Sequence, residues 1–503
     1  MRANLRTMTR LIVVTLAMAS LFAGARAQAQ ESWDVFYMGQ AKIGYAHTFV
    51  EKVKDRGREL LRVRIDLEQR LKRGNDATVT KLMYGTIETL EGRVLRLDTL
   101  TTVGQGTRIQ THGDVIDGKM ELILEGTGQR QVLTIPWGPE VRGPYAPEQS
   151  MARQPMIEGE TRSLRMFMPE LNKICDVTLK ADKVQPTLLG DASSRPLLKV
   201  DMELSVEGKH RPEFDVTHWV DAQGQVLKAE QDLMGGLVTF RTTKQAALSP
   251  SGPIKFDMIR QTIVKVRDFT DPERTRRVTY RLSLKGGDPV KVFPVDSRQG
   301  FDAAAEARPN SAVMIVQSQG PTDGAAGPSE VAAEYLEPNA LINSNDEEVK
   351  RQALRVTRGL DDAWAKVDRV NHWVFSSIQD KNFSTAFAPA SDVVRNLSGD
   401  CTEHAVLVAA MLRAVGVPSR VVVGLVYFQD DRLRIKGFGY HMWDEVYVNQ
   451  RWVAIDPSFD QTTVDAVHIK LTESSLKGVT PFETFAPILS VIGKLEIDPL
   501  EVR

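Results

Sequence analysis

Three residues toward the C-terminal end of the sequence have side chains that together could carry out cysteine-based acyl transfer. Cys401, His441 and Asp456 all lie in the stretch from Gly399 to Asp456. A cysteine thiolate attacks a carbonyl carbon, an imidazole carries the proton of the thiol and of the leaving group, and a carboxylate orients the imidazole. We therefore predict these three residues as the catalytic site, provided that the surrounding elements bring the side chains together.

Cys401 is predicted to be the first residue of a helix. Asp400 and Glu403 form a capping-box pattern, in which each side chain accepts a hydrogen bond from the backbone amide of the other residue. Gly416 and Pro418 mark the end of this helix. Its apolar residues recur at intervals of three and four, which predicts one buried face: Ala405, Val408, Met411, Leu412 and Val415. Because the helix dipole is positive at the N-terminus, it favours the thiolate form of a cysteine placed there.

A hairpin is predicted to carry the other two side chains. Strands over 441–448 and 451–456 flank Asn449-Gln450, and a two-residue loop at that point would pair Trp443 with Asp456. His441 then lies diagonally across from Asp456 on the same face, a placement from which side chains reach each other. The inference depends on the register, since a shift of one residue would put the two side chains on opposite faces.

Several neighbouring residues have competing interpretations. His404 is a rival base, but a ring three residues along the helix points along the helix axis rather than toward a substrate in front of its N-terminus. The backbone amide of Cys401 is the natural first donor to an oxyanion, whereas Trp373 lies in a helical context that suits core packing. Trp443 and Trp452 either line a substrate cleft or cover the hairpin.

Four segments of the sequence also carry a resemblance to a known family. They are Gly-Asp-Cys-Thr-Glu-His-Ala at 399–405, Arg-Ala-Val-Gly-Val-Pro-Ser-Arg-Val at 413–421, His-Met-Trp-Asp-Glu-Val-Tyr-Val at 441–448 and Trp-Val-Ala-Ile-Asp-Pro-Ser at 452–458. In type and order they resemble the bacterial transglutaminase-like superfamily, over roughly residues 335 to 475. The resemblance implies a papain-like α+β fold in which Cys401 is the nucleophile, His441 the general base and acid, and Asp456 the orienting carboxylate.

The resemblance specifies the type of reaction better than it specifies the substrate. The family includes cross-linking transglutaminases, peptidases, amidases and inactive members. We expect a protein or peptide substrate and a thioester on Cys401. If water attacks this thioester, the chain is a peptidase or amidase, which is the favoured interpretation. If an amine attacks it, the chain is a protein-glutamine cross-linking transglutaminase. A hypothesis of another class is a non-catalytic envelope binding or assembly protein with an inactive transglutaminase-like domain.

The composition is that of a folded, multidomain protein. The chain has 503 residues, 42% hydrophobic and 26% charged, and a length of this order predicts about two to four domains. A net charge of −1 gives no basic surface for a nucleic-acid partner. The sequence lacks HExxH, CxxC and calcium-loop patterns, so we predict no cofactor and no metal.

The first residues have the pattern of a secretory signal peptide. Arg2, Arg6 and Arg10 precede an apolar run from Leu11 to Ala23, and small residues follow at 25–29. A run of this length is too short for a comfortable membrane anchor, although an uncleaved signal anchor is the alternative. We predict a signal peptide over 1–29, a periplasmic or secreted location, and no stable membrane span in the mature protein.

The organisation of the remaining chain follows from its periodicity. We predict a β-rich antiparallel region over 30–250, a third β segment over 251–318, a linker over 319–330 and a catalytic domain over 331–503. The β-rich region could recognise an envelope or extracellular partner. Its segments at 91–96 and 223–228 indicate either two similar halves or two unrelated hairpins.

Local signals support this division. Alternating apolar residues at 61–67 predict a half-buried strand, and Asp117-Gly118 predicts a hairpin turn. A capping-box pattern at 344–347 predicts a helix to about Arg358, and two further helices are expected after Asp361 or Asp362 and near 392–397.

The second cysteine has a structural interpretation. Cys175 lies in a predicted strand and is interpreted as a small buried hydrophobe. A disulfide with Cys401 is the alternative in an oxidising compartment, and it would consume the nucleophile.

Overall fold

The computed structural model describes residues 30–503 except 74–75, 105–106, 127–128, 234–235, 251, 253–261, 268, 307, 324–326, 328–329, 381–386, 431–434 and 479–480. The predicted signal peptide over 1–29 lies outside the described residues, as do parts of the predicted linker over 319–330. No helix in the described part of the chain combines the length and the apolar composition needed to cross a bilayer.

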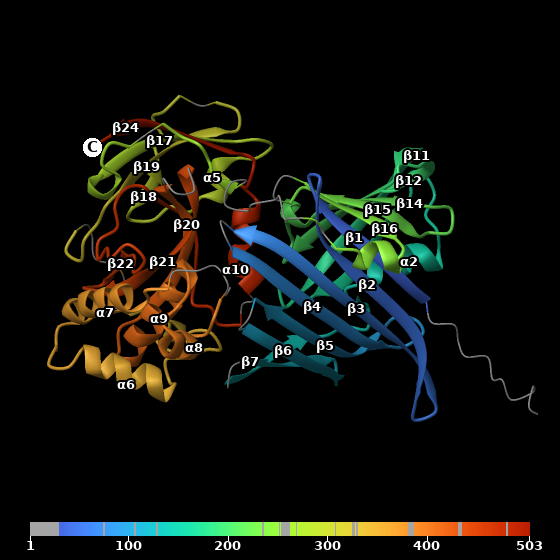
Figure 1. The fold of residues 1–503 in the computed structure, drawn as a ribbon, viewed down its shortest axis with the longest axis horizontal. Helices are drawn as coiled ribbons and strands as arrows, with labels where there is room; N and C mark the ends of the chain where they lie inside the picture. The colour runs from blue at the N-terminus through green and yellow to red at the C-terminus, as the bar shows by residue number, and fades with distance from the viewer. Residues whose placement is uncertain are drawn as a thin grey trace, which may run out of the picture.

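The N-terminal half of the chain forms one large sheet (Figure 1). Its strands are β1 (Gln30–Met38), β2 (Ala41–Asp55), β3 (Arg58–Arg73), β4 (Asp76–Glu88), β5 (Val94–Val103), β6 (Thr107–Ile116), β7 (Lys119–Gly126), β8 (Gln129–Pro136), β9 (Val141–Arg142), β10 (Thr161–Met168), β11 (Lys173–Leu188), β12 (Ser194–Val206), β13 (Lys209–His210), β14 (Val216–Val220), β15 (Val226–Gln231) and β16 (Leu237–Thr242). The helices α2 (Ala146–Arg153) and α3 (Lys244–Leu248) accompany it.

The strands of this sheet follow two runs that meet at β1 and β16. β8 to β1 form a meander, β1 then pairs with β16, and the order continues β15, β14, β12, β11, β10 and β9. All these pairs are antiparallel except that of β9 with β10. The predicted antiparallel β-rich region is therefore confirmed. The similarity of its halves stays a prediction, although the turns that end in Gly92 and Gly224 share one hydrogen-bonding pattern.

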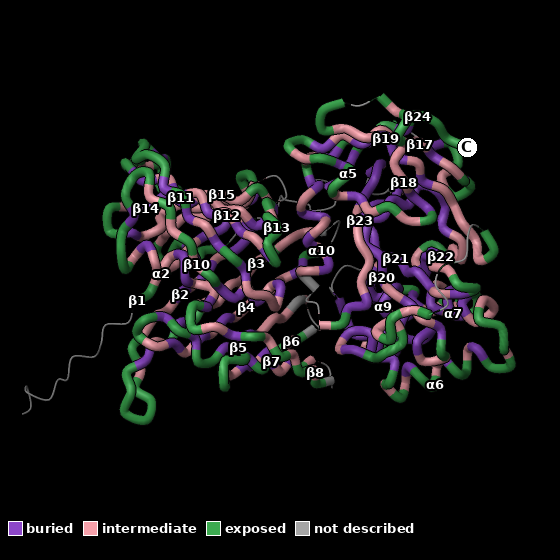
Figure 2. The backbone as a smooth tube through the Cα atoms, turned by 180° about the vertical axis from the view of Figure 1, so that it is seen from behind, coloured by how far each residue is buried: buried purple, intermediate pink, exposed green. Residues whose placement is uncertain are grey.

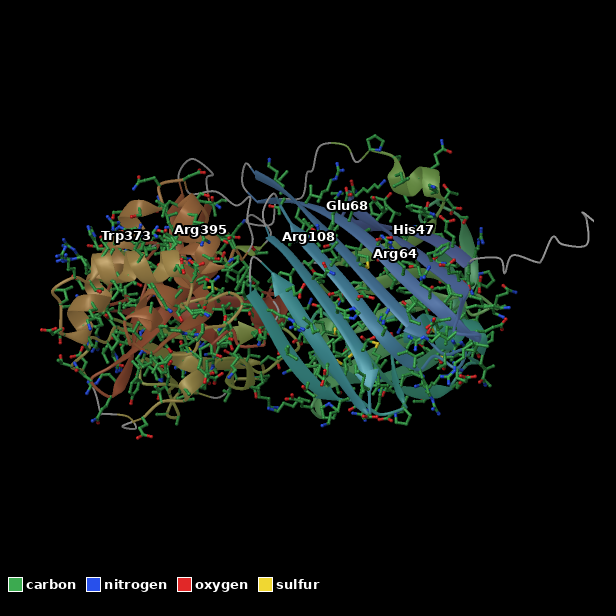
Figure 3. All side chains as sticks on the ribbon, turned by 90° about the horizontal axis from the view of Figure 1, so that it is seen from below. His47, Arg64, Glu68, Arg108, Trp373 and Arg395 are labelled. Atoms are coloured by element: carbon green, nitrogen blue, oxygen red, sulfur yellow. The ribbon has the colours of Figure 1, made fainter. Side chains whose placement is uncertain are left out.

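Local sequence signals account for the strands. Val63 of β3 is buried while Arg62 and Arg64 are exposed, as the alternation predicts, and Leu61 is half-buried. Leu60, which has the parity of Arg62 and Arg64, is buried as well and departs from the alternation. Asp117 and Gly118 have φ angles of 49° and 73° and join Ile116 to Lys119, so the predicted hairpin turn is present. Figure 3 shows the side chains of His47, Arg64, Glu68 and Arg108 on this sheet and those of Trp373 and Arg395 on the helical body beside it.

A second, four-stranded sheet combines two distant parts of the chain. It has the order β18-β19-β17-β24, with β17 (Arg277–Leu284), β18 (Gln299–Phe301), β19 (Ser311–Gln317) and β24 (Leu495–Val502). The short helix α5 (Pro289–Val292) lies against it. The predicted third β segment thus shares a sheet with the C-terminal strand and a hydrophobic core with the helices that follow it. The predicted domain boundaries themselves stay predictions.

The remaining elements build the body that carries the predicted site. The helices are α6 (Glu347–Val356), α7 (Ala363–Ser377), α8 (Ala390–Asn396) and α9 (Cys401–Ala414). The third sheet has the order β22-β21-β20-β23, with β20 (Ser419–Asp430), β21 (Ile435–Val448), β22 (Arg451–Ile455) and β23 (His468–Ser474).

The three predicted helices before Cys401 are present. Asp346, not Ser344, caps α6, because its carboxylate accepts from the amides of Glu348 and Val349.

α9 is buried more completely than the sequence suggests. Its apolar residues predict one buried face, yet every residue from Thr402 to Arg413 is buried. The reason is its central position, since α9 contacts β20 and β21 as well as α6, α7 and α8. Figure 2 shows this dense buried core around α9. A helix surrounded in this way holds its N-terminus firmly in one place.

One helix connects the two halves of the molecule. α10 (Pro481–Leu489) lies between the N-terminal sheet and the helical body (Figure 1). Ala486 packs into the core of the N-terminal sheet, Glu483 is 3.1 Å from the Lys173 ammonium, and the Phe485 ring contacts Phe387 with centroids 5.3 Å apart.

Candidate active site

The N-terminus of α9 is organised as the capping pattern predicts. Asp400 is the N-cap, and its Oδ1 accepts from the Thr402 amide at 2.9 Å. The Asp400 amide in turn donates to Glu403 Oε2 at 2.9 Å, which completes the capping box. Cys401 is therefore the first residue of the helix and is half-buried.

Glu403 also joins this helix to the loop in front of it. Its side chain is completely buried, and Oε1 accepts from the Ala388 amide at 3.0 Å. Burial, assisted by the charge of Asp400, raises the pKa of Glu403 to about 8. One carboxyl group thus satisfies two backbone donors, that of Asp400 directly before Cys401 and that of Ala388.

The hairpin has the predicted register over most of its length. Asn449 and Gln450 form the loop with φ angles of 49° and 58°, and the pairs run from Val448–Arg451 to Asp444–Ile455. The predicted pair between Trp443 and Asp456 is wrong, because the ladder stops one pair earlier. Asp456 exchanges backbone hydrogen bonds with Gln461 instead, at 2.6 and 2.9 Å. The physical reason is the next residue, Pro457, which has no amide hydrogen to continue a ladder.

The structure nevertheless brings all three predicted residues together. His441 Nε2 lies 2.6 Å from Asp456 Oδ2, and both side chains are almost completely buried. Cys401 also interacts electrostatically with the His441 ring, whose Nδ1 is the nitrogen not bonded to Asp456. The imidazole is therefore placed between the sulfur and the carboxylate.

Electrostatics favour the cationic form of this imidazole. Burial alone would lower the pKa of His441, but the charges of Asp456 and Cys401 and the hydrogen bonds to both outweigh it and raise the pKa to about 10. Burial would likewise raise the pKa of Asp456, and the two neighbouring imidazoles instead hold it well below its usual range. The carboxylate is ionised and the ring protonated at neutral pH.

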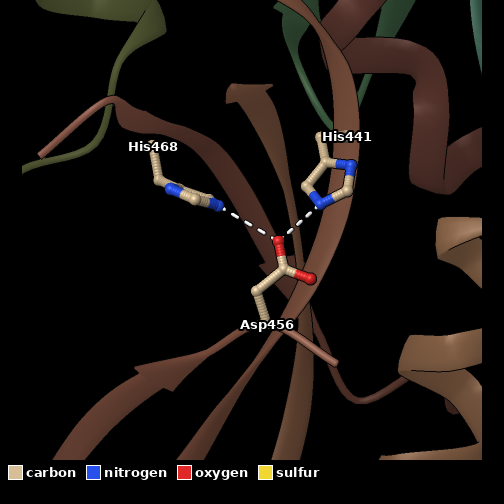
Figure 4. A group of neighbouring side chains, drawn as sticks. All are labelled: His441, Asp456 and His468. Atoms are coloured by element: carbon tan, nitrogen blue, oxygen red, sulfur yellow. Dashed lines mark hydrogen bonds and ion pairs between the residues drawn. The ribbon is translucent and has the colours of Figure 1, made fainter. Parts of the chain in front are cut away.

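A fourth and a fifth side chain belong to the same cluster and were missed by the sequence reasoning. His468 Nε2 is 3.1 Å from Asp456 Oδ2 (Figure 4). His468 Nδ1 is 2.7 Å from Asp465 Oδ1. His468 begins β23, which pairs with β20 and not with the hairpin, so local spacing does not connect it to Asp456. The one available signal is a histidine at the start of a strand, three residues after an aspartate.

The same cluster was tested as a metal site. In the described part of the chain, the ligand atoms of His441, Asp456 and His468 lie within 4.8 Å of one another. Both imidazoles, however, direct Nε2 at the same carboxylate oxygen, and their other nitrogens face Cys401 and Asp465. These atoms are already used in hydrogen bonds, so we interpret the group as a hydrogen-bonded cluster rather than a set of metal ligands.

The aromatic residues around the site differ in position from the expectation. Trp443 is completely buried among Val422, Ala454 and Val464, and it therefore belongs to the core. The Arg420 guanidinium lies over the Trp452 ring, 4.1 Å from the centroid of that ring.

The aromatic ring that does face solvent beside the triad is Phe459, which was not predicted. It is 45% exposed and stacks on His441 with centroids 5.1 Å apart. Trp373 packs against the hydrophobic core, in agreement with its helical context.

The remaining candidates have structural roles. His404 is buried, and its Nδ1 donates to the Asp400 carbonyl at 2.7 Å, which directs the ring along the helix as expected. Cys175 is buried in the core of the N-terminal sheet, and burial raises its pKa to about 12. Cys175 and Cys401 are both free.

Comparison with known proteins supports the assignment of the region. A model of the transglutaminase-like superfamily matches residues 350–457. A solved structure of a proposed cysteine protease from Cytophaga hutchinsonii is 13% identical over 45% of this chain and 86% of its own, with a TM-score of 0.29. The periplasmic domain of TgpA from Pseudomonas aeruginosa is 16% identical over 38% of this chain and 75% of its own, with a TM-score of 0.27.

A third solved structure is also similar to part of this chain. A β-barrel-like protein of a domain of unknown function from Brucella abortus is 10% identical over 44% of this chain and 98% of its own, with a TM-score of 0.32. No curated protein matches the chain. The family match covers the helix of Cys401, the strand of His441 and the turn of Asp456, and the C-terminal region of this chain is transglutaminase-like.

Proposed function

We propose that this chain is a cysteine enzyme that attacks a peptide or carboxamide carbonyl with Cys401 and passes through a thioester. The observation that carries the proposal is the position of His441, whose Nε2 lies 2.6 Å from Asp456 Oδ2 and whose ring interacts electrostatically with Cys401. In this proposal the C-terminal body has a papain-like arrangement, with the nucleophile on a helix and its partners on strands.

The proposed reaction has two halves, formation of the thioester and its hydrolysis, and Cys401 and His441 act in both. The Cys401 sulfur bonds to the carbonyl carbon, and the His441 imidazolium gives its proton to the departing nitrogen as the carbon–nitrogen bond breaks. A water molecule then gives a proton to the neutral imidazole and its oxygen to the acyl carbon, which releases a carboxylic acid and restores the thiolate–imidazolium pair. The Cys401 amide at the start of α9 is placed to donate to the oxyanion.

We propose hydrolysis rather than amine transfer as the second half. Cys401 is half-buried rather than enclosed, and solvent reaches the neighbouring Phe459. A thioester at such a position is accessible to water. Amine transfer, which would make the chain a cross-linking transglutaminase, remains the competing outcome of the experiment below. We further propose that the chain is exported to the periplasm or secreted, on the basis of the signal-peptide pattern over 1–29.

The first experiment tests whether Cys401 is an activated nucleophile. Full-length protein is treated with iodoacetamide at pH 6, where an unactivated thiol hardly reacts. We expect one alkylated site that is lost in Cys401→Ser and kept in Cys175→Ser, the matched control with the other free cysteine. Absence of selective labelling would leave the non-catalytic binding or assembly role as the better hypothesis.

The second experiment separates the outcomes of the thioester. The protein is incubated with a peptide library and a primary amine, and the products are measured by mass spectrometry. Peptide cleavage or deamidation is the expected result, with Cys401→Ser as the blank. Incorporation of the amine without hydrolysis would instead establish a transglutaminase.

A further inference from the structure

A second histidine lies directly behind the candidate triad. His468 is completely buried, and each of its ring nitrogens faces a carboxylate oxygen, Asp456 Oδ2 at 3.1 Å and Asp465 Oδ1 at 2.7 Å. A carboxylate only accepts hydrogen bonds, so a ring that bonds to two of them donates from both nitrogens, which is the cationic form of histidine. His468 is thus a buried positive charge between two buried carboxylates.

Asp465 is itself held in place by several donors. Its Oδ1 also accepts from the Val467 amide at 3.1 Å, and its Oδ2 accepts from Gln461 Nε2 at 2.9 Å. The Arg298 guanidinium donates to the Asp465 carbonyl at 2.9 Å. Gln461 is also the residue that exchanges backbone hydrogen bonds with Asp456. One small loop therefore fixes both carboxylates that hold the ring of His468.

The order of the contacts forms a continuous chain toward the sulfur. Asp465 bonds to His468, His468 to Asp456, and Asp456 to His441, whose remaining nitrogen serves Cys401. The two histidines bond to the same oxygen of Asp456, so its carboxylate cannot rotate without losing both contacts. An orienting carboxylate that is locked in this way holds the imidazole in the direction that the reaction requires.

We propose that His468, anchored by Asp465, is a positioning residue for the reaction at Cys401, which it serves by locking Asp456 and neutralising part of the buried negative charge. The inference rests on the proposed function, because it assigns His468 to that same site. His468 does not touch the reacting atoms and acts through Asp456.

The groups that face His468 determine its charge. Asp456 and Asp465 approach from the loop that follows β22, and His441 approaches from β21 with ring centroids 6.0 Å apart. Trp443 and Phe459 contribute uncharged ring faces. Burial would lower the pKa of His468, but the charge of Asp465 and the hydrogen bonds to both aspartates raise it to about 9.

Beyond this group lie the buried Asp444, whose pKa is raised well above its usual range by burial and by the charge of Asp456, and Lys470, which is already paired. Lys470 of β23 bonds to Glu445 at 2.9 Å and to Asp296 at 3.0 Å. A positive charge lowers the pKa of groups near it and its removal raises them. Loss of the His468 charge should therefore move the pH profile of the whole site upward.

The test is the rate of Cys401 alkylation by iodoacetamide as a function of pH in His468→Gln, in which glutamine preserves a donor but cannot carry the charge. We expect the midpoint of the acid limb to rise by roughly one pH unit and the plateau rate to fall about tenfold. The matched control is His112→Gln, because His112 also bonds to two aspartates, Asp98 at 2.6 Å and Asp114 at 3.2 Å, on the distant N-terminal sheet. That control should reproduce the wild-type profile.

The outcomes separate this inference from the proposed function. If wild-type Cys401 is reactive at low pH and His468→Gln gives the same profile, the inference is overturned and the proposed function stands. If wild-type Cys401 shows no reactivity at low pH, the proposed function is lost and the inference with it.

A measurement on the wild-type protein covers the case in which His468→Gln does not fold. In 15N-histidine spectra at pH 7, His468 should be protonated on both nitrogens, and Asp465→Asn should shift its signals and thereby assign them. A neutral His468 in the wild type would overturn the inference regardless of how the variants behave.

Discussion

Gly424 of β20 lies directly opposite His441 of β21 in the antiparallel ladder. A Cβ atom at Gly424 would lie 2.2 Å from the Ile469 carbonyl oxygen and 2.5 Å from the Trp443 ring, so no side chain fits there. Ile469 follows His468, and Trp443 follows His441 by two residues. The glycine therefore allows both strands that carry the histidines to approach β20 closely.

The first prediction follows from this contact. Gly424→Ala should lower the free energy of unfolding by about 1–3 kcal/mol, the usual cost of overpacking. It should also slow Cys401 alkylation, because β21 or β23 must move. The matched control is Gly85→Ala in β4, where the nearest atom to the new Cβ would be 3.7 Å away. Chemical denaturation measures the loss of stability, and the alkylation rate measures the effect on the site. Wild-type values of both in Gly424→Ala would contradict the prediction.

The second prediction concerns the carboxylate that orients His441. Asp456→Asn removes the negative charge from the centre of the cluster and should reduce peptidase or amidase activity by roughly a thousandfold or more, by analogy with the Ser-His-Asp enzymes. Asp444→Asn is the matched control, because Asp444 is equally buried on the strand that carries His441, and burial raises its pKa well above the usual range. Exchange of this carboxyl group for an amide of the same shape should preserve activity, because neither Asp444 oxygen has a hydrogen-bond partner among the described residues. Equal losses in the two variants would show that only general disruption had been measured.

The third prediction is the pH dependence of stability. The folded pKa values of His441 and His468, about 10 and about 9, lie above the value of about 6.5 for an unfolded histidine. A raised histidine pKa stabilises the protein fully below the unfolded value, and this stabilisation is lost as the pH rises through the folded value. The melting temperature should therefore fall from about pH 6.5 to about pH 10, and the fall between about pH 6.5 and 9 should be less steep in His468→Gln. Differential scanning fluorimetry on both proteins in the same buffers cancels the effects of other groups, and parallel curves would contradict the prediction.

The fourth prediction addresses the start of α9. Glu403→Ala leaves the amides of Asp400 and Ala388 without their acceptor and should cost about 1–3 kcal/mol of stability. Since Asp400 directly precedes Cys401, alkylation should slow as well. Asp362→Ala, which removes the cap of α7 at the Ala365 amide, is the control and should cost about 1 kcal/mol without changing the alkylation rate. Urea denaturation measures the first effect, and unchanged alkylation in Glu403→Ala would refute the link to the site.

Much of the site could be predicted because its signals are local. The capping box around Cys401 and the two-residue loop at Asn449-Gln450 each depend on a few adjacent residues, and both are present. The register from the loop then brings His441 near Asp456 even though the ladder ends one pair early. The early end of the ladder does not affect the prediction of the site, because the side chains of His441 and Asp456 remain at neighbouring positions.

What could not be predicted depends on contacts between distant segments. His468 reaches Asp456 only because β23 pairs with β20 on the side away from the hairpin, and no sequence spacing specifies that order. The complete burial of α9 likewise depends on helices that pack around it from elsewhere in the chain. The single large N-terminal sheet depends on the pairing of β1 with β16, which a meander pattern does not reveal.

The pairing of β24 with β17 has a consequence for biosynthesis. β17 is translated long before β24, so a nascent chain that emerges from the ribosome in order has an incomplete sheet with an open edge until the last strand arrives. The same edge would attract other unpaired strands during that interval. Cells that make this protein therefore need to shield the edge of β17, and truncations that remove Leu495–Val502 should be prone to aggregation even though they leave every residue of the proposed triad in place.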